Sequence, residues 1–273
     1  MTDRYAVIGN PVAHSMSPQI HAMFARETGT DIIYERLLAP RDGFAATVQS
    51  FRASGGIAAN VTLPFKLEAF ALAQSHSARA QHCGAVNTLK FIGDEIHGDI
   101  TDGVGLTRDI EHNLGVAIGG RRVLLLGAGG AARGVVADIL LARPASLSIA
   151  NRTAARATEI AETFRDLGTI NAIEIEALST QPFDIIINAT SAGLNDALPP
   201  IHAACFANGA LAYDMVYGRD TPFLALARLA GARAADGLGM LVEQAAESFY
   251  RWRGVRPATA PVIAQLQVER RDS

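Results

Sequence analysis

The sequence is poor in the residues that metal sites and disulfide frameworks require. Its 273 residues include two cysteines, Cys83 and Cys205, which lie far apart and form no C-x-x-C pair. The 7 histidines show no spacing suited to a zinc site either. We interpret both cysteines as reduced thiols of the core and expect no bound metal.

The sequence also lacks long hydrophobic runs and a marked excess of either charge. No run approaches the roughly 20 apolar residues of a membrane-spanning helix, and the apolar stretch before Asn10 is too short for the core of a signal peptide. A formal net charge of -3 gives no electrostatic signature of nucleic-acid or membrane binding. We therefore expect a cytoplasmic protein, with no nucleic-acid partner and no membrane partner.

The composition is that of a globular protein, with 49% hydrophobic and 19% charged residues. Short apolar runs alternate with helix-like segments, and two strand-like stretches about Gly93-Asp94 predict a β-hairpin over residues 87–100. This order predicts an α/β fold with mostly parallel sheets. Strands are expected at 5–9, 32–39, 57–63, 146–151, 173–178, 183–190 and 210–217. Helices are expected near residues 17, 42 and 64 and over 101–115, 153–166 and 222–230.

A glycine-rich turn follows the apolar strand that begins the second half of this pattern. The stretch "VLLLGAGGAARG" places Gly127, Gly129 and Ala132 in the G-x-G-x-x-A register between a strand and a helix. Gly127 permits a tight turn, Gly129 allows the backbone to approach a pyrophosphate, and a helix N-terminus near Ala131 offers free N–H groups. The motif predicts a Rossmann-like dinucleotide-binding domain, although a well-packed strand-to-helix turn is the simpler alternative.

The end of the next strand favours NADP over NAD. An NAD site usually has an acidic residue there to hold the ribose 2′-hydroxyl, whereas this chain has Asn151 followed by Arg152. Arg152 and Arg156 can offer planar, bidentate donors to a 2′-phosphate. The alternative is that Thr153 caps a helix and the arginines are a solvated first turn, but cations are unfavourable at a helix start.

Polar residues at strand ends in the first half are candidates for acid–base chemistry, because reduction of a carbonyl leaves an alkoxide that needs a proton. Lys66 follows Pro64, so we expect it in the first turn of a helix, where a cation opposes the helix dipole. Asp102 is the obvious carboxylate to offset it. From the residues alone the two are either a pair or unrelated surface charges, and His14 is a weaker rival as the acid–base group.

The motifs together resemble the shikimate dehydrogenase family, over about residues 4–268. They are "GNPVAHSMSP", "ANVTLPFK", "GAVNTL", "DITDGVG", "LLLGAGGAARG", "NRT", "INATSAG", "YDMVYG", "TPFL" and "DGLGMLVEQAA". The resemblance implies reversible, NADPH-dependent reduction of 3-dehydroshikimate to shikimate, a step toward aromatic amino acids. It also implies a discontinuous substrate-binding domain over 1–102 and 238–273, an NADP-binding Rossmann domain over 103–237, and a deep cleft between them.

The resemblance also implies roles for individual residues. Lys66 and Asp102 match the catalytic pair, with Lys66 as proton donor and acceptor and Asp102 as its partner and a substrate ligand. The other matched substrate-binding positions are Ser15, Ser17, Asn60, Thr62, Asn87, Tyr217 and Gln244, with Ser15, Ser17 and Tyr217 at the substrate carboxylate. The matched cofactor-binding positions are Gly127, Ala128, Gly129, Gly130, Ala131, Asn151, Arg152, Thr153, Arg156, Met215 and Gly239.

Some questions stay open on the sequence. Ala78 stands where many relatives carry an acidic residue, which leaves the role of that position in doubt. A quinate or dual quinate/shikimate dehydrogenase is the alternative enzyme, although it is usually NAD-linked and an acidic residue near 151–153 would then be expected. A non-catalytic NADP-binding regulatory module would have no use for Lys66 and Asp102 together. No feature separates a monomer from a homodimer.

Overall fold

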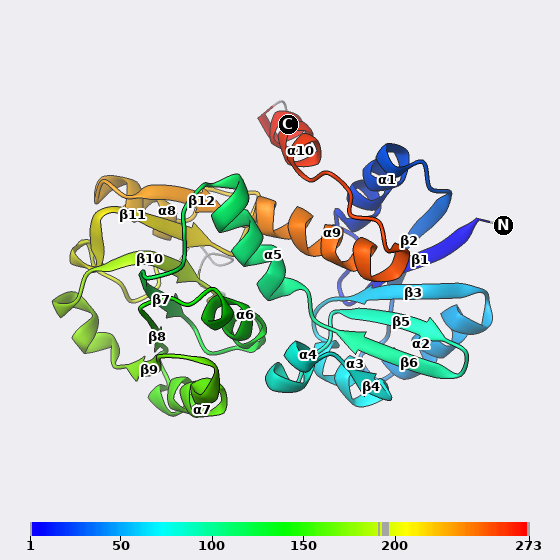
Figure 1. Ribbon diagram of the computed structural model, residues 1–273, viewed down its shortest axis with the longest axis horizontal. Helices are drawn as coiled ribbons and strands as arrows, with labels where there is room; N and C mark the ends of the chain where they lie inside the picture. The colour runs from blue at the N-terminus through cyan, green and yellow to red at the C-terminus, as the bar shows by residue number, and fades with distance from the viewer. Residues whose placement is uncertain (1, 191, 193–196, 272–273) are drawn as a thin grey trace. The chain divides into compact units, whose positions relative to one another are not determined.

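The computed structural model describes residues 2–190, 192 and 197–271 (Figure 1). The chain forms two compact units, Met1–Gly105 with Val242–Ser273, and Leu106–Leu241. The boundaries fall inside two helices, α5 (Asp102–Arg108) and α9 (Leu238–Arg253). Within the described residues, no helix combines the length and the apolar character that crossing a bilayer requires.

The first unit contains a mixed sheet with the strand order β2-β1-β3-β5-β6-β4. Strand β1 (Asp3–Gly9), next to the edge strand, pairs in parallel with β2 (Ile32–Leu38) and β3 (Gly56–Val61). The predicted hairpin is confirmed as antiparallel β5 (Thr88–Ile92) and β6 (Glu95–Asp99), and the short β4 (Ser75–His76) extends it. The unit's remaining helices are α1 (Ser17–Thr28), α2 (Phe44–Ala53), α3 (Lys66–Leu72), α4 (Ala78–Cys83) and α10 (Ala260–Arg271).

The second unit contains an all-parallel sheet with the strand order β12-β11-β10-β7-β8-β9. The order reverses between β7 and β10, which is the doubly wound arrangement that places ligands at the carboxyl ends of the strands beside that reversal. The strands are β7 (Arg122–Leu126), β8 (Ser146–Ala150), β9 (Ile170–Ile173), β10 (Phe183–Asn188), β11 (Phe206–Asp214) and β12 (Arg233–Asp236), and helices α6 (Gly130–Leu141), α7 (Ala154–Phe164) and α8 (Pro222–Leu229) connect them.

Several local predictions were wrong. The expected strand at 173–178 is a 3-10 turn over Ile175–Thr180, and the strand precedes it as β9. Both Ile173 and Ile175 pack on the core, so a short apolar–polar alternation could not distinguish the two structures. The helix expected over 101–115 begins at Asp102 and changes after Arg108 into a π-helical segment, Asp109–Asn113. Pro64 precedes α3 in a turn with a cis peptide bond and is not its first helical residue.

Candidate functional site

Lys66 and Asp102 form an ion pair within the first unit. Lys66 Nζ lies 2.5 Å from Asp102 Oδ2, and the two side chains are 22% and 11% exposed. Each is the first residue of a helix, Lys66 of α3 and Asp102 of α5. A carboxylate is favourable at a helix start and a cation is not, so Asp102 offsets the unfavourable placement of Lys66. The pair is partly buried, so solvent ions screen its attraction only weakly. Both side chains still have exposed area that a ligand can contact.

Asn87 holds the other oxygen of the Asp102 carboxylate. The backbone N–H of Thr101 donates to Asn87 Oδ1 at 2.9 Å, which identifies that atom as the acceptor end of the amide. Asn87 Nδ2 therefore faces Asp102 Oδ1, at 2.9 Å. Asn87 is 2% exposed, so neighbouring residues fix its orientation. As a result, Asp102 Oδ1 accepts from the Asn87 amide and Oδ2 accepts from the Lys66 ammonium. The two contacts fix the orientation of the carboxylate.

Buried hydroxyls and amides extend this arrangement toward α9. Gln244 Oε1 accepts from Asn87 Nδ2 at 3.4 Å and from the Thr101 hydroxyl at 3.3 Å. Asn60 Nδ2 donates to the Ser248 hydroxyl at 2.9 Å, and Asn60 Oδ1 accepts from the Tyr34 hydroxyl at 2.8 Å. Because buried polar groups need partners, this network specifies one arrangement of the side chains around Lys66 and Asp102.

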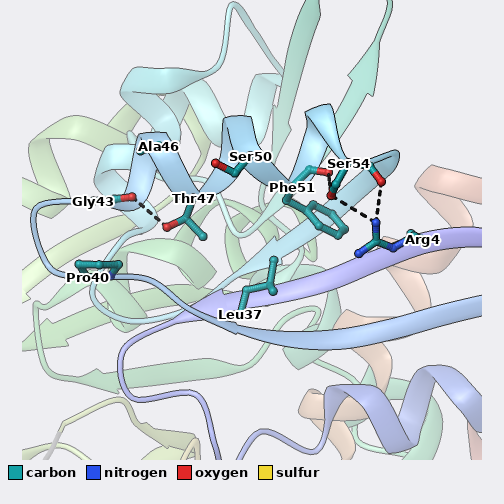
Figure 2. Close-up of a pocket in the computed structure, with 9 residues that line it drawn as sticks. All are labelled: Arg4, Leu37, Pro40, Gly43, Ala46, Thr47, Ser50, Phe51 and Ser54. Atoms are coloured by element: carbon teal, nitrogen blue, oxygen red, sulfur yellow. Dashed lines mark hydrogen bonds between the residues drawn. The ribbon is translucent and has the colours of Figure 1, made fainter.

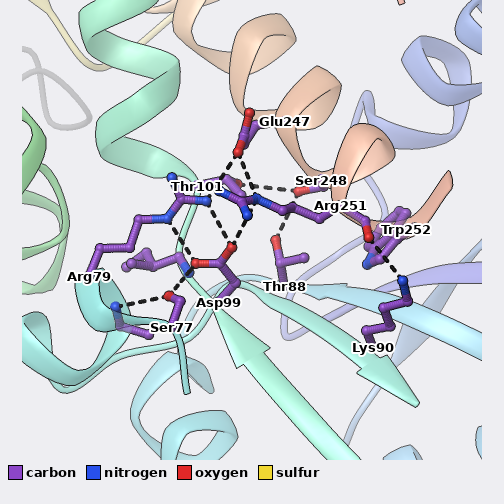
Figure 3. A network of polar contacts seen from close by, with 12 residues as sticks. Ser77, Arg79, Thr88, Lys90, Asp99, Thr101, Glu247, Ser248, Arg251 and Trp252 are labelled. Atoms are coloured by element: carbon purple, nitrogen blue, oxygen red, sulfur yellow. Dashed lines mark hydrogen bonds and ion pairs between the residues drawn. The ribbon is translucent and has the colours of Figure 1, made fainter. Parts of the chain in front are cut away.

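An ionic cluster fixes α9 to the hairpin (Figure 3). Arg79 donates to both oxygens of Asp99 at 2.8 Å and pairs with Glu247 at 3.2 Å. Arg251 also pairs with Glu247, at 2.8 Å. Burial favours the neutral form of Glu247, but the guanidinium of Arg256, with those of Arg79 and Arg251, holds its pKa below the usual value. The cluster keeps Gln244, which lies one turn before Glu247, beside Asn87.

The loops after β1 and β3 lie against each other at the carboxyl ends of these strands. The Ser15 and Ser17 hydroxyls are 3.2 Å apart, and Ser17 begins α1. A Cβ atom on Gly9 would lie 2.4 Å from Thr62 Cγ2, so only glycine permits this approach. Asn10 N–H donates to Leu63 C=O at 3.0 Å. The predicted residues Ser15, Ser17, Thr62 and Lys66 thus belong to one edge of one sheet.

In the second unit, the glycine-rich turn has the geometry that an anion site requires. Gly127 has φ +106°, and a Cβ there would lie 3.1 Å from the Ala189 carbonyl oxygen. Gly129 and Gly130 are exposed, and a Cβ on either would meet nothing within 4 Å. Helix α6 begins at Gly130 with no side-chain cap and no acidic residue in its first turn. Its first N–H groups are therefore available to a pyrophosphate, beside Ala128 and Ala131.

The end of β8 carries exposed cations and no carboxylate. Asn151 Nδ2 donates to the Thr153 carbonyl at 2.9 Å, which closes the turn before α7. Thr153 is the N-cap residue, but its hydroxyl makes no capping bond, so the capping interpretation is wrong for the side chain. Arg152 and Arg156 are exposed, and no carboxylate of the described residues forms an ion pair with either. This composition fits a 2′-phosphate.

A buried carboxylate fixes the segment around Met215. The buried carboxylate of Asp214 accepts from Thr221 at 2.6 Å, Val216 N–H at 3.0 Å and Asn188 at 3.1 Å. These bonds fix the turn after β11 that contains Met215 and Tyr217. Burial raises the pKa of the Tyr217 hydroxyl.

Gly239 packs directly on a buried carboxylate. A Cβ on Gly239 would lie 1.9 Å from Asp109 Oδ1, so no other residue fits there. Tyr213 donates to Asp109 Oδ2 at 2.6 Å and accepts from Met240 N–H at 3.2 Å. Burial, and then the Asp109 charge, raise the pKa of Tyr213. Asp109 and Tyr213 were not predicted from the sequence. The only sign of their role in the sequence is that each is a polar residue within an otherwise apolar segment.

One pocket of about 450 Å³ lies on the α2 side of the first sheet and includes none of the predicted site residues (Figure 2). Its walls include Leu37, Pro40 and Phe51, and the Arg4 guanidinium at its side is bonded to Ser54 and to Glu35. The hydroxyls of Thr47 and Ser54 in its wall donate to backbone carbonyls of Gly43 and Phe51. The described residues contain no group of three His, Cys, Asp or Glu side chains that could hold a metal ion.

Three family models match successive parts of the chain. The shikimate dehydrogenase substrate binding domain matches residues 7–89, and shikimate / quinate 5-dehydrogenase matches residues 110–195. The shikimate 5'-dehydrogenase C-terminal domain matches residues 237–267. Together the three matches include most of the site residues predicted from the sequence.

Individual proteins are similar over nearly the whole chain. A shikimate dehydrogenase (NADP(+)) of Nitrosospira multiformis is 57% identical over 269 residues, which are 98% of either chain. The crystal structure of an Ael1 enzyme from Pseudomonas putida is 50% identical with a TM-score of 0.94, covering 97% of this chain and 98% of that one. Shikimate 5-dehydrogenase of Thermus thermophilus, crystallised with NADP(H) and shikimate, is 32% identical with a TM-score of 0.87, covering 96% and 98%.

Proposed function

The chain belongs to the shikimate dehydrogenase family, and from this premise we propose how its residues carry out the reversible, NADPH-dependent reduction of 3-dehydroshikimate to shikimate. The enzyme is an NADP-dependent oxidoreductase acting on a CH–OH group, and its reaction is a step toward chorismate and the aromatic amino acids. Residues 1–102 and 238–273 form the substrate-binding domain of this proposal, and residues 103–237 the NADP-binding domain.

In the NADP-binding domain, the turn of Gly127, Ala128, Gly129, Gly130 and Ala131 binds the pyrophosphate through backbone N–H groups. Arg152 and Arg156 bind the 2′-phosphate, because two exposed guanidiniums without a carboxylate partner among the described residues favour a dianion. Asn151 and Thr153 shape the turn that carries them. Met215 and Gly239 line the nicotinamide end. Bound NADPH supplies the hydride.

In the substrate-binding domain, Ser15 and Ser17 bind the substrate carboxylate, and Tyr217 contributes a hydroxyl to the same group. Thr62, Asn87 and Gln244 bind the ring hydroxyls, and Asn60 supports them through Ser248 and Tyr34. These assignments are supported by the common edge of the sheet on which Ser15, Ser17 and Thr62 lie, and by the network that joins Asn87 to Gln244.

Lys66 and Asp102 move the proton. During reduction the Lys66 ammonium donates a proton to the carbonyl oxygen as negative charge develops there, and during oxidation the neutral amine takes it back from the hydroxyl. Asp102 orients the ammonium through Oδ2, and Asn87 orients Asp102 through Oδ1. Asp102 also accepts from the reacting hydroxyl, so substrate and lysine share one carboxylate.

The observation that carries this proposal is the 2.5 Å contact between Lys66 and Asp102. The deciding experiment follows NADPH formation with purified enzyme, using shikimate or quinate as substrate and NADP or NAD as cofactor. Turnover of shikimate with NADP supports the proposal. Comparable turnover of quinate would make it a dual quinate/shikimate dehydrogenase, and tight NADP binding without turnover of either substrate would make it a regulatory module. The cytoplasmic location and the monomeric or homodimeric state remain predictions from the sequence.

A further inference from the structure

Arg36 clamps the carbonyl group of Ser15. Its Nε and Nη2 atoms both donate to Ser15 O, at 2.9 and 2.6 Å. Two donors of one guanidinium on one carbonyl oxygen fix the position of the loop between β1 and α1. Both bonds come from a charged donor and meet the same oxygen, although they lie at the exposed surface of the loop.

The alternation of β2 places Arg36 on the same face of the sheet as Tyr34. Successive side chains of a strand point to opposite faces, and Tyr34 reaches Asn60 in the site network. Glu35 and Leu37 point to the other face, toward Arg4 and the α2 pocket of Figure 2. Arg36 therefore lies on the face of the sheet that carries Tyr34 and the site network. Glu35, the nearest carboxylate along the strand, lies on the opposite face.

The Arg36 charge has no counter-ion in the part of the chain that the structure describes. Its bonds go to a neutral carbonyl, and no described carboxylate lies within ion-pair distance. By contrast, Glu35 one residue earlier is paired with Arg4 at 2.7 Å. Arg36 is exposed, so an anion that binds at this loop can approach its positive charge.

The loop that Arg36 holds presents neutral groups to an anion. Ser15 and Ser17 offer hydroxyls, and Ser17 N–H donates to Ser15 Oγ at 3.3 Å. Helix α1 starts here with no side-chain cap and no acidic residue in its first turn. Hydroxyls alone do not compensate the charge of a carboxylate that leaves water, so a cation close to this loop lowers the cost of binding an anion there.

We propose that Arg36 is a specificity-determining positioning residue for the substrate carboxylate, which places the Ser15 hydroxyl through the carbonyl clamp and supplies the compensating positive charge. The inference rests on the proposed function, because it assumes that Ser15 and Ser17 bind the carboxylate of shikimate. It adds a residue that selects anionic over neutral substrates without contacting the reacting oxygen.

The test combines a change in the protein with a change in the ligand. Wild type, Arg36→Gln and Arg36→Lys are compared with shikimate and with its neutral methyl ester, as KM where the ester turns over and as an inhibition constant where it does not. Arg41→Gln, in an exposed loop five residues along the chain, removes the same charge and serves as the matched control. The KM for NADP and the thermal midpoint report on folding.

We expect Arg36→Gln to raise the KM for shikimate about three- to tenfold, the effect of one partly screened charge at short range, with the ester barely affected. The ratio of the constant for the ester to that for shikimate is therefore smaller in Arg36→Gln than in wild type, and Arg36→Lys restores part of the difference. An unchanged preference in Arg36→Gln, or an equal loss of both ligands, would overturn the proposal. Failure of wild type to oxidise shikimate would instead refute the proposed function, so the two failures are distinguishable.

Discussion

Asn87 donates from Nδ2 to Oδ1 of Asp102 at 2.9 Å, while Lys66 occupies Oδ2 of the same carboxylate. The carboxylate is thus held at both oxygens before any ligand binds. Because Asn87 is bonded to Thr101 and Gln244 as well, a change at any of these residues is transmitted to the Lys66 ammonium through Asp102.

Replacing Lys66 with alanine removes the proposed proton carrier. We expect Lys66→Ala to lower kcat by about 10²- to 10⁴-fold, the usual contribution of general acid–base catalysis, with KM for shikimate near normal. Steady-state kinetics in the direction of NADPH formation measures both values. The chain's other lysine, Lys90, donates to the Arg251 carbonyl and provides the control, since Lys90→Ala should keep kcat. A normal kcat with a raised KM in Lys66→Ala would make Lys66 a binding residue only.

Arg152→Ala removes a donor from the proposed 2′-phosphate site. We expect the KM for NADP to rise about tenfold or more, because a charge-assisted bond is lost, while any turnover with NAD changes little. Kinetics with both cofactors gives the preference directly. Arg165→Ala, at the far end of α7, should leave the preference unaltered. An unaltered preference in Arg152→Ala as well would rule out the phosphate assignment.

Gly239→Ala tests the contact with Asp109. The added methyl group would overlap the Asp109 carboxylate, which is buried and bonded to Tyr213, so it displaces a buried charge from its partner. We expect a loss of about 3 kcal/mol or more in the free energy of unfolding. Thermal and urea unfolding measure it.

Gly129→Ala is the matched variant for this experiment, because a Cβ there meets nothing within 4 Å. It should unfold like wild type and lose affinity for NADP, since the methyl group blocks the approach of a pyrophosphate. A stable Gly239→Ala protein would show that the contact with Asp109 relaxes easily.

His21 predicts a pH dependence of stability. It is fully buried and stacks on Tyr34 with ring centroids 4.2 Å apart. Burial lowers its pKa from 6.5 to about 3. As the pH falls below 6.5 the unfolded chain takes up the proton first, so the contribution is full above pH 6.5 and is lost progressively toward about pH 3.

The slope of this loss is about 1.4 kcal/mol per pH unit for one proton. Urea unfolding between pH 7 and 4.5 should show it in wild type, and His21→Phe should reduce the slope by one proton. His202→Gln, at the surface, should not change it. Equal slopes in wild type and His21→Phe would mean that His21 titrates normally.

The parts of the site that depend on local chemistry were predictable. The glycine turn, the hairpin and the cations after β8 are each formed by fewer than about fifteen consecutive residues. Within such a short segment, the strand, turn and helix preferences of the residues determine the local structure directly. The pairing of Lys66 with Asp102 was not decidable from the residues, because 36 positions separate them and only the fold brings them together. The resemblance to a family supplied what local pattern could not.

The contacts that no pattern predicted are those between distant segments. Tyr213 and Asp109 are 104 positions apart, and Asn60 and Ser248 are 188 apart. Such side chains look like ordinary polar residues within apolar segments until the packing is known. The strand expected at 173–178 failed for a related reason, because a short alternation satisfies the core equally well as a strand or as a turn.

The close approach of Gly9 to Thr62 has a consequence for binding entropy. The loops after β1 and β3 are joined backbone to backbone through Asn10 and Leu63, so their conformational freedom is lost when the protein folds. Ordering the backbone of one residue costs about 1–2 kcal/mol in conformational entropy. A ligand that binds Ser15, Ser17 and Thr62 therefore finds loops for which most of this cost was already met on folding. A residue larger than glycine at position 9 would separate the loops and transfer that cost from folding to substrate binding.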